Sequence, residues 1–106
     1  MSGQHNHILA AFSPDEFELI HPYLEPVEFT ARKSLEQPGR PIDWVYFPED
    51  GVASVVATAK HGRTVEVGII GRDGMTGLSL VLGAERATNE TYVQVAGTGT
   101  RECPRR

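Results

Sequence analysis

The stretch that decides the fold is VYFPEDG at residues 45–51, followed by TVEVGIIGRDGMTG at residues 64–77. Each segment is a run of aromatic and β-branched residues that leads into a glycine-containing turn. Short runs between regularly spaced glycine and proline turns are typical of antiparallel β-structure. A further run at residues 52–58 is separated from residues 64–70 by a polar connection, which predicts a β-hairpin. We therefore expect a small antiparallel β-roll.

The chain continues this strand pattern on both sides. An alternation with period two begins at Val27, and residues 44–47 form the next expected strand after a turn at residues 37–40. Leucines at positions 78, 80 and 82 indicate either a short strand or a helical turn. Residues 92–95 supply the last clear strand.

The N-terminal part predicts helices instead. Ser13 is followed by Pro14 and, three residues after the serine, by Glu16, which is the pattern of a capping box. Phe12 and Phe17 are spaced as a hydrophobic staple around this cap. We expect a helix that starts here and ends before Pro26, with a shorter helix before it through Ile8, Leu9 and Phe12.

After Val95 the apolar pattern stops. We therefore expect one β-roll domain over residues 6–96 and an irregular tail over residues 97–106. A roll that is incomplete at its C-terminus would leave an unpaired strand edge, which predicts marginal stability, self-association or a homodimer. A truncated or frameshifted gene would explain this ending.

Composition limits the function. The chain has 106 residues and a formal net charge of -4, which argues against direct DNA contact because DNA binding requires basic residues. The arginines at 101, 105 and 106 are expected to be solvated. No apolar run is long enough to cross a membrane and no signal peptide is visible, so a cytoplasmic location is expected. The single cysteine, Cys103, excludes an internal disulfide.

Catalytic and metal-binding patterns are weak. His5 and His7 have the spacing of a metal-binding β-roll of the cupin type, but they precede the first helix, and His61 lies at the hairpin tip. No serine or cysteine has a histidine nearby in a nucleophile pattern. We expect no metal, no cofactor and no enzymatic activity, with a cupin-type metal enzyme as the less favoured alternative.

The glycine-rich segment at residues 71–77 is the best candidate for a ligand site, because its backbone N–H groups could face an anion. It lacks the Gly-Lys-Ser/Thr ending of a P-loop and opens no βαβ unit. Arg86 is a cation that could meet such an anion, unless it is a surface arginine paired with Glu85 or Glu90. The alternative is a tight turn in which the glycines only supply positive φ angles.

In this order, the segments 35–39, 45–52, 62–68 and 71–77 resemble the N-terminal domain of CRP/FNR-type bacterial transcription regulators, over roughly residues 8–95. The resemblance implies a cyclic-nucleotide-binding-like jelly roll that senses an effector. In the family, a dimerisation helix and a helix-turn-helix follow this roll and read DNA. This chain matches the sensor only.

The resemblance also implies ligand-binding positions, which are Gly74, Gly77, Leu78, Arg86, Ala87 and Thr88. In nucleotide-binding members the cassette has a glycine followed by glutamate, whereas here Gly77 is followed by Leu78. The missing acid argues against cyclic AMP as the effector. We therefore expect a sensor domain that couples an unknown signal to a helix-turn-helix missing from this chain. The alternative is a stand-alone small-ligand-binding module.

Overall fold

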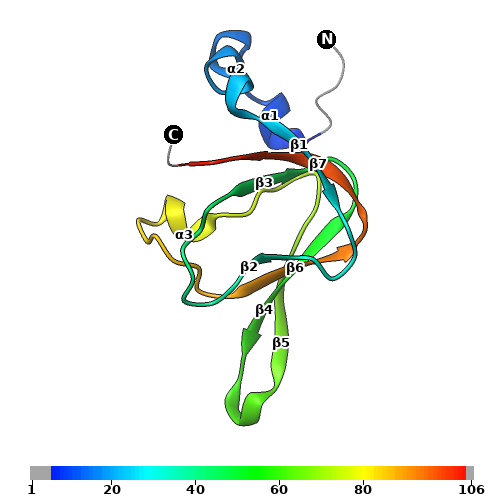
Figure 1. The fold of residues 1–106 in the computed structure, drawn as a ribbon, viewed down its shortest axis with the longest axis vertical. Helices are drawn as coiled ribbons and strands as arrows, with labels where there is room; N and C mark the ends of the chain where they lie inside the picture. The colour runs from blue at the N-terminus through cyan, green and yellow to red at the C-terminus, as the bar shows by residue number, and fades with distance from the viewer. Residues whose placement is uncertain (1–5, 105–106) are drawn as a thin grey trace.

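The computed structural model describes residues 6–104, and its strands form two antiparallel sheets, one of three strands and one of four. Helices α1 (His7–Ala10) and α2 (Pro14–Ile20) lie at one end of the molecule (Figure 1). The hairpin of β4 (Val52–Thr58) and β5 (Thr64–Ile70) projects from the other end. The predicted mainly β fold with N-terminal helices is confirmed.

The three-stranded sheet consists of β1 (Glu25–Phe29), β7 (Gly97–Glu102) and β3 (Val45–Pro48). Strand β7 is its central strand, and Gly99 pairs with Val27 on one side and with Pro48 on the other. The predicted irregular tail is therefore wrong for residues 97–102, and residues 105–106 lie outside the described part. The strand needs no apolar pattern, because its backbone hydrogen bonds to both neighbours hold it in place.

The glycines of β7 allow this close approach. A Cβ atom at Gly99 would lie 2.5 Å from the carbonyl oxygen of Phe47 and 2.8 Å from Cε2 of Phe29. A Cβ atom at Gly97 would lie 2.4 Å from the carbonyl oxygen of Asp50. The Gly-Thr-Gly-Thr sequence is thus suited to a strand packed tightly between others, although it looks like a flexible end.

The four-stranded sheet contains β2 (Ser34–Glu36), β6 (Glu90–Val95), β4 (Val52–Thr58) and β5 (Thr64–Ile70). The predicted hairpin is confirmed, with a short 3-10 turn η2 (Lys60–Gly62) as its connection. His61 and Gly62 have φ angles of 64° and 75°, which close this connection. Strand β5 is an edge strand with exposed Val65, Val67 and Ile69. Its pairing with β4 skips Val67, since Gly68 pairs with Val55 and Glu66 with Val56, so Val65 and Ile69 lie on opposite faces of the sheet.

The N-terminal helices are α1 (His7–Ala10) and α2 (Pro14–Ile20), followed by the 3-10 turn η1 (His21–Tyr23). The capping box is confirmed by hydrogen bonds between Ser13 and Glu16 in both directions, at 2.8 and 3.1 Å. The α-helix ends at Ile20 and β1 begins at Glu25, so the strand starts two residues before the predicted Val27. Proline is tolerated at position 26 because β1 is an edge strand.

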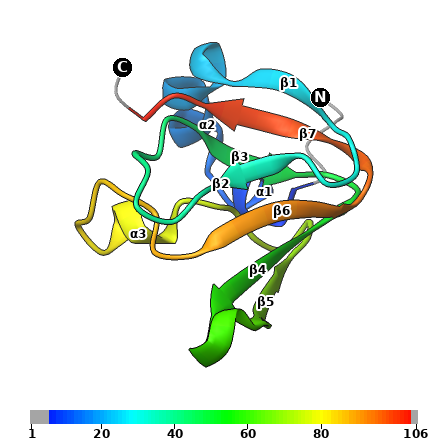
Figure 2. The ribbon, with the colours of Figure 1, turned by 60° about the horizontal axis from the view of Figure 1, so that its bottom comes forward.

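The three-stranded sheet separates two hydrophobic cores. Figure 2 shows strands β1, β7 and β3 beside β2 and β6 of the second sheet. On one face, Val45 and Phe47 pack with Leu9 beneath the helices. On the other face, Tyr46 and Phe29 pack with Val93 of the second sheet. Strand β3 is therefore buried on both faces, so its register is strongly specified. Segments that form hydrogen bonds to β3 are held in a defined position.

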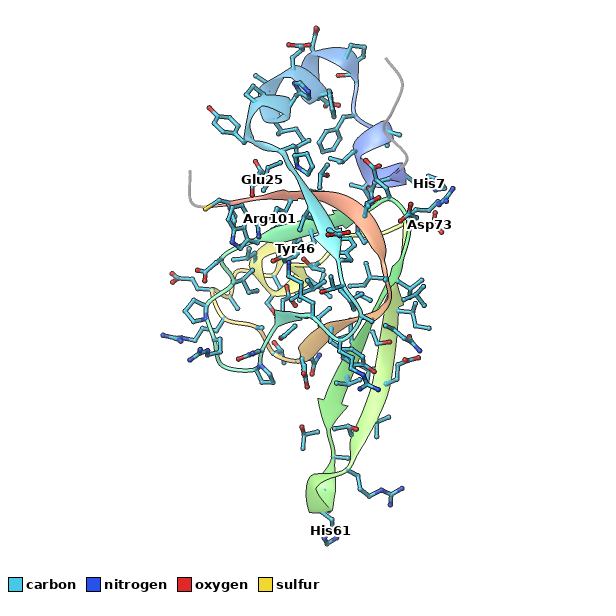
Figure 3. The ribbon with its side chains drawn as sticks, turned by 45° about the vertical axis from the view of Figure 1, so that its right-hand side comes forward. His7, Glu25, Tyr46, His61, Asp73 and Arg101 are labelled. Carbon is cyan, nitrogen blue, oxygen red and sulfur yellow. The ribbon has the colours of Figure 1, made fainter. Side chains whose placement is uncertain are left out.

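The expectation of solvated arginines is wrong for Arg101 of β7. Its guanidinium contacts Glu25 Oε1 from Nε at 2.8 Å and from Nη2 at 2.7 Å, and its Cζ lies 3.8 Å from the centre of the Trp44 ring. Figure 3 shows Arg101 beside Glu25 and Tyr46. This arginine joins β7 to β1 and to the residue before β3.

Candidate functional site

The glycine turn, defined as residues 71–77, connects β5 to the short helix α3 (Leu78–Val81). The helical-turn alternative for the leucines is thus the correct one. Thr76 fixes the turn to β3, since its N–H donates to the Tyr46 carbonyl at 3.0 Å and its Oγ1 accepts from the Tyr46 N–H at 2.9 Å. Gly77 has a φ of 88° and lies close to the Val45 side chain, so the turn ends in a conformation that favours glycine.

The backbone N–H of Gly77 is already used within the chain. It donates to Oε2 of Glu36 at 2.8 Å, and the other carboxylate oxygen of Glu36 accepts from the Thr91 hydroxyl at 3.2 Å. Burial raises the pKa of Glu36, and the hydrogen bonds from Thr91 and Gly77 only partly offset this effect. An internal carboxylate thus occupies the position at the glycine turn where an external anion was expected.

A cavity of about 490 Å³ lies beside the turn, a volume within the range of small-molecule sites. We call it the glycine-turn cavity. Its apolar walls come mainly from β5, the glycine turn and α3. Its polar side chains come from Glu36, from the glycine turn and α3, and from the residues around the start of β6. The complete lining is Glu36, Val55, Val67, Gly68, Ile69, Ile70, Met75, Thr76, Gly77, Leu78, Ser79, Leu82, Thr88, Asn89 and Thr91.

The structure brings together only some of the predicted ligand-binding residues. Gly77, Leu78 and Thr88 line the glycine-turn cavity. Gly74 does not line it, and its carbonyl accepts a hydrogen bond from the Asn6 side chain instead. Leu78 is 67% exposed, so this position marks the rim of the cavity.

Arg86 and Ala87 lie outside the lining as well. The exposed Arg86 side chain donates from Nη1 to the Gly39 carbonyl at 2.9 Å, and so the predicted alternative of pairing with Glu85 or Glu90 is wrong. Ala87 is buried and exchanges backbone hydrogen bonds with the segment at residues 39–40. The contact of Arg86 with a ligand remains a prediction, since its side chain does not line the cavity and its Nη1 donates to Gly39.

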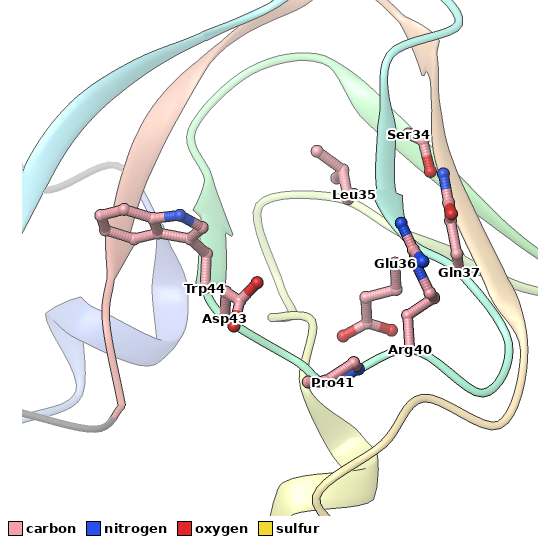
Figure 4. A pocket seen from close by; sticks show the side chains of 8 residues that line it. All are labelled: Ser34, Leu35, Glu36, Gln37, Arg40, Pro41, Asp43 and Trp44. Atoms are coloured by element: carbon pink, nitrogen blue, oxygen red, sulfur yellow. The ribbon is translucent and has the colours of Figure 1, made fainter.

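Glu36 also lines a second, smaller pocket of about 200 Å³. Figure 4 shows its side chain among those of Leu35, Arg40, Pro41 and Asp43. Arg40 forms no ion pair with Glu36 in the described part of the chain. The carboxylate therefore lies at the boundary of two pockets.

No role could be assigned to Glu36, Asn6 or Thr91 from the sequence, although Glu36 belongs to one of the segments that resemble the family. Asn6 carried a signal, since asparagine directly before an apolar helical pattern is a preferred N-cap. For Glu36 the partners are 41 and 55 positions away, so no local pattern marked it.

The described histidines form no metal site. His7 contacts Asp73 as an ion pair when its imidazole is protonated, while His61 lies at the hairpin tip, far from His7 (Figure 3). His5 lies outside the described residues. Among residues 6–104, no group of three or more histidine, cysteine, aspartate or glutamate residues is arranged to hold a metal ion. None of the helices in this part has the length and apolarity needed to cross a membrane.

Comparison with known proteins gives a fold but no close relative. Neither the known protein-family models nor the curated proteins contain a match. The solved structures do contain matches, including a mutant regulatory subunit of a cAMP-independent protein kinase A from Trypanosoma brucei with cAMP bound in its A site. The TM-score is 0.81 at 16% identity, over 94% of this chain and 37% of that one.

Two further structures have the same fold. One is the corresponding regulatory subunit from Trypanosoma cruzi bound to guanosine, with a TM-score of 0.78 at 15% identity over 89% of this chain and 34% of that one. The other is the sensor domain of the transcriptional regulator DNR from Pseudomonas aeruginosa, with a TM-score of 0.76 at 12% identity over 94% and 67%. The chain spans well under half the length of the two kinase subunits. It therefore has the fold of cyclic-nucleotide-binding domains, which is also the fold of the sensor domain of a bacterial transcription regulator.

Proposed function

We propose that this chain is the sensor domain of a CRP/FNR-type transcription regulator and that it binds a small-molecule effector in the glycine-turn cavity. The observation that carries the proposal is the cavity itself, about 490 Å³ in a domain with the fold of regulator sensor domains. Its apolar walls and few polar groups match the usual composition of a small-molecule site.

The cavity is placed where an effector could change the shape of the domain. Its walls include Val67 and Ile69 of the projecting hairpin and Leu78 and Leu82 in and after α3. Hairpin and helix are separate elements that meet at the glycine turn, so a molecule between them would change their relative positions. A ligand shifts such an equilibrium only if it binds one arrangement more tightly than the other.

The chemical class of the effector follows from this site and from its structural neighbours. One neighbour binds cAMP, an anion, and another binds guanosine, which is neutral. We infer that the effector here is a molecule of similar size. It acts without being chemically converted, and the signal passes to a helix-turn-helix domain outside this chain.

Titration of the 15N-labelled chain with guanosine, cyclic AMP and cyclic GMP tests the proposal. We expect saturable shifts of the Gly77, Thr88 and Thr91 amide signals with at least one of these probes. The Ser79→Phe variant should abolish them, because the added ring would fill the cavity. Lys60→Phe adds the same ring at the exposed hairpin tip and should leave binding unchanged.

The possible outcomes separate the proposal from its alternatives. Saturable shifts that persist in Ser79→Phe would place the ligand elsewhere, and no saturable shift with any probe would contradict an effector cavity. Binding of a cyclic nucleotide that is lost in Arg86→Ala would show that this arginine leaves Gly39 to meet a phosphate. A helix-turn-helix encoded downstream in any reading frame supports a regulator, whereas none would leave a stand-alone ligand-binding module.

A further inference from the structure

The glycine-turn cavity has an uneven distribution of charge. Among its lining residues, Glu36 has the only charged side chain, and no lysine, arginine or histidine lines it. The remaining polar groups are hydroxyls, one amide side chain and the backbone. A ligand that enters this cavity therefore meets a carboxylate and no cation.

The carboxylate of Glu36 is held rigidly enough to act as a recognition group. Its two oxygens accept from the Gly77 N–H at 2.8 Å and from the Thr91 hydroxyl at 3.2 Å. Thr91 is 1% exposed, and Gly77 is also buried. A carboxylate offers about four acceptor positions, so about two remain for donors on a ligand.

An anionic ligand is disfavoured in this cavity for two reasons, the lack of a free N–H donor and the charge of Glu36. The N–H of Gly77, which a phosphate or carboxylate would need, already donates to Glu36. Displacing Glu36 would leave its own charge half-buried, and keeping it would place two negative charges side by side in an apolar cavity. The cation Arg86 does not line the cavity, and its Nη1 donates to the Gly39 carbonyl.

We propose that the glycine-turn cavity selects a neutral or cationic ligand, an apolar body bearing an amine or hydroxyl that donates to Glu36, and that it excludes anions, including cyclic nucleotides. This inference rests on the proposed effector site and adds its charge selectivity. Glu36 is the specificity-determining residue, since it supplies the acceptor for the ligand and removes the donor that an anion would use.

Three probes with one ring and different head groups test the selectivity: 2-phenylethylamine, 2-phenylethanol and phenylacetate, which are cationic, neutral and anionic at neutral pH. Dissociation constants come from the Gly77 and Thr91 amide shifts of the full chain. Because charge-assisted hydrogen bonds are about twice as strong as neutral ones, we expect the amine to bind at least about tenfold more tightly than phenylacetate. The alcohol should lie between them.

Variants assign the effect to Glu36. Glu36→Gln keeps one acceptor for Gly77 but removes the charge, and it should reduce the preference for amine over phenylacetate to within about threefold. Glu18→Gln removes an exposed carboxylate on α2 and should leave the preference unchanged.

The outcomes separate the two claims. If phenylacetate binds as tightly as the amine, or if Glu36→Gln keeps the full preference, the selectivity proposal is wrong while the effector site stands. If none of the three probes gives saturable shifts, the effector site fails and the selectivity fails with it. The wild-type comparison decides the question even if Glu36→Gln does not fold.

Discussion

The side chain of Asn6 donates a hydrogen bond to the carbonyl oxygen of Gly74 at 2.9 Å, across 68 positions of sequence. The same amide group donates to the Pro48 carbonyl at 2.7 Å, while its oxygen accepts from the N–H groups of Ile8 and Leu9. Asn6 is fully buried. One residue thus caps α1 and attaches it to both β3 and the glycine turn.

Asn6→Ala should lower the free energy of unfolding by about 3 kcal/mol, because it removes a helix cap and leaves two carbonyl groups without their donor. Asn6→Asp should be about as harmful near neutral pH. Aspartate is normally an equally good N-cap, but here its second oxygen would face the carbonyl oxygens of Pro48 and Gly74. Urea unfolding measures both changes.

The exposed cap of α2 is the control for Asn6. Ser13→Ala should cost about 1 kcal/mol, and Ser13→Asp should cost little, since Ser13 makes no long-range hydrogen bond in the described structure. If Asn6→Asp were as stable as the wild type, the attachment to Pro48 and Gly74 would contribute nothing.

Gly99→Ala should destabilise the domain by about 2 to 3 kcal/mol, because the new methyl group would lie far inside contact distance of Phe47 and Phe29. For a domain of this size, that corresponds to a fall in Tm of roughly 8 to 20 °C. Gly71→Ala is the matched control, since a Cβ there meets no atom within 4 Å and its φ is not positive. Equal melting temperatures of Gly99→Ala and Gly71→Ala would contradict the packed central strand.

The stability of the wild type relative to Glu36→Gln should increase as the pH falls from about 7 to about 4. Burial raises the pKa of Glu36, so the folded chain holds this proton more tightly than the unfolded chain. The stabilising contribution is complete below the unfolded pKa and is lost as the pH rises through the folded pKa. Urea unfolding of both proteins at several pH values measures the difference between their free energies of unfolding. The contributions of the other titrating groups cancel in this difference because both proteins share them. A difference that grows in the opposite direction would show that Glu36 is stabilised as a carboxylate.

Self-association remains an expectation, but its structural cause has changed. Strand β7 occupies the centre of the three-stranded sheet, and exposed apolar side chains lie instead on the edge strand β5, where Val65 is 49% exposed, and on and after α3 at Leu78, Val81 and Leu82. The strand edge of β5 is the part that can pair with a second chain. Val65→Lys should weaken association at least about tenfold, because charged side chains protect sheet edges. Sedimentation velocity over a range of concentrations tests this, with Leu19→Lys on α2 as the control for an exposed apolar residue elsewhere. A wild type that stays monomeric at every concentration would refute the expectation.

The local elements could be predicted because their causes are local. The capping box at Ser13 and Glu16 needs only residues three apart, and the hairpin of β4 and β5 needs only two β-branched runs and a short connection. The order of glycine turns along the chain was also sufficient to indicate the type of β-fold. In each case the interactions that determine the structure join residues close in sequence.

The tertiary structure alone decided β7 and the chemistry of the candidate site. Residues 97–102 have no apolar pattern, and they become a central strand because β1 and β3 on either side supply backbone partners. The close approach of neighbouring backbone leaves room only for glycine at positions 97 and 99. Glu36 meets Gly77 and Thr91 only after β2 pairs with β6 and the glycine turn is fixed to β3. The sequence by itself located the turn. Which group accepts the hydrogen bond from the Gly77 N–H depends on a contact between distant segments, and such contacts exist only in the folded chain.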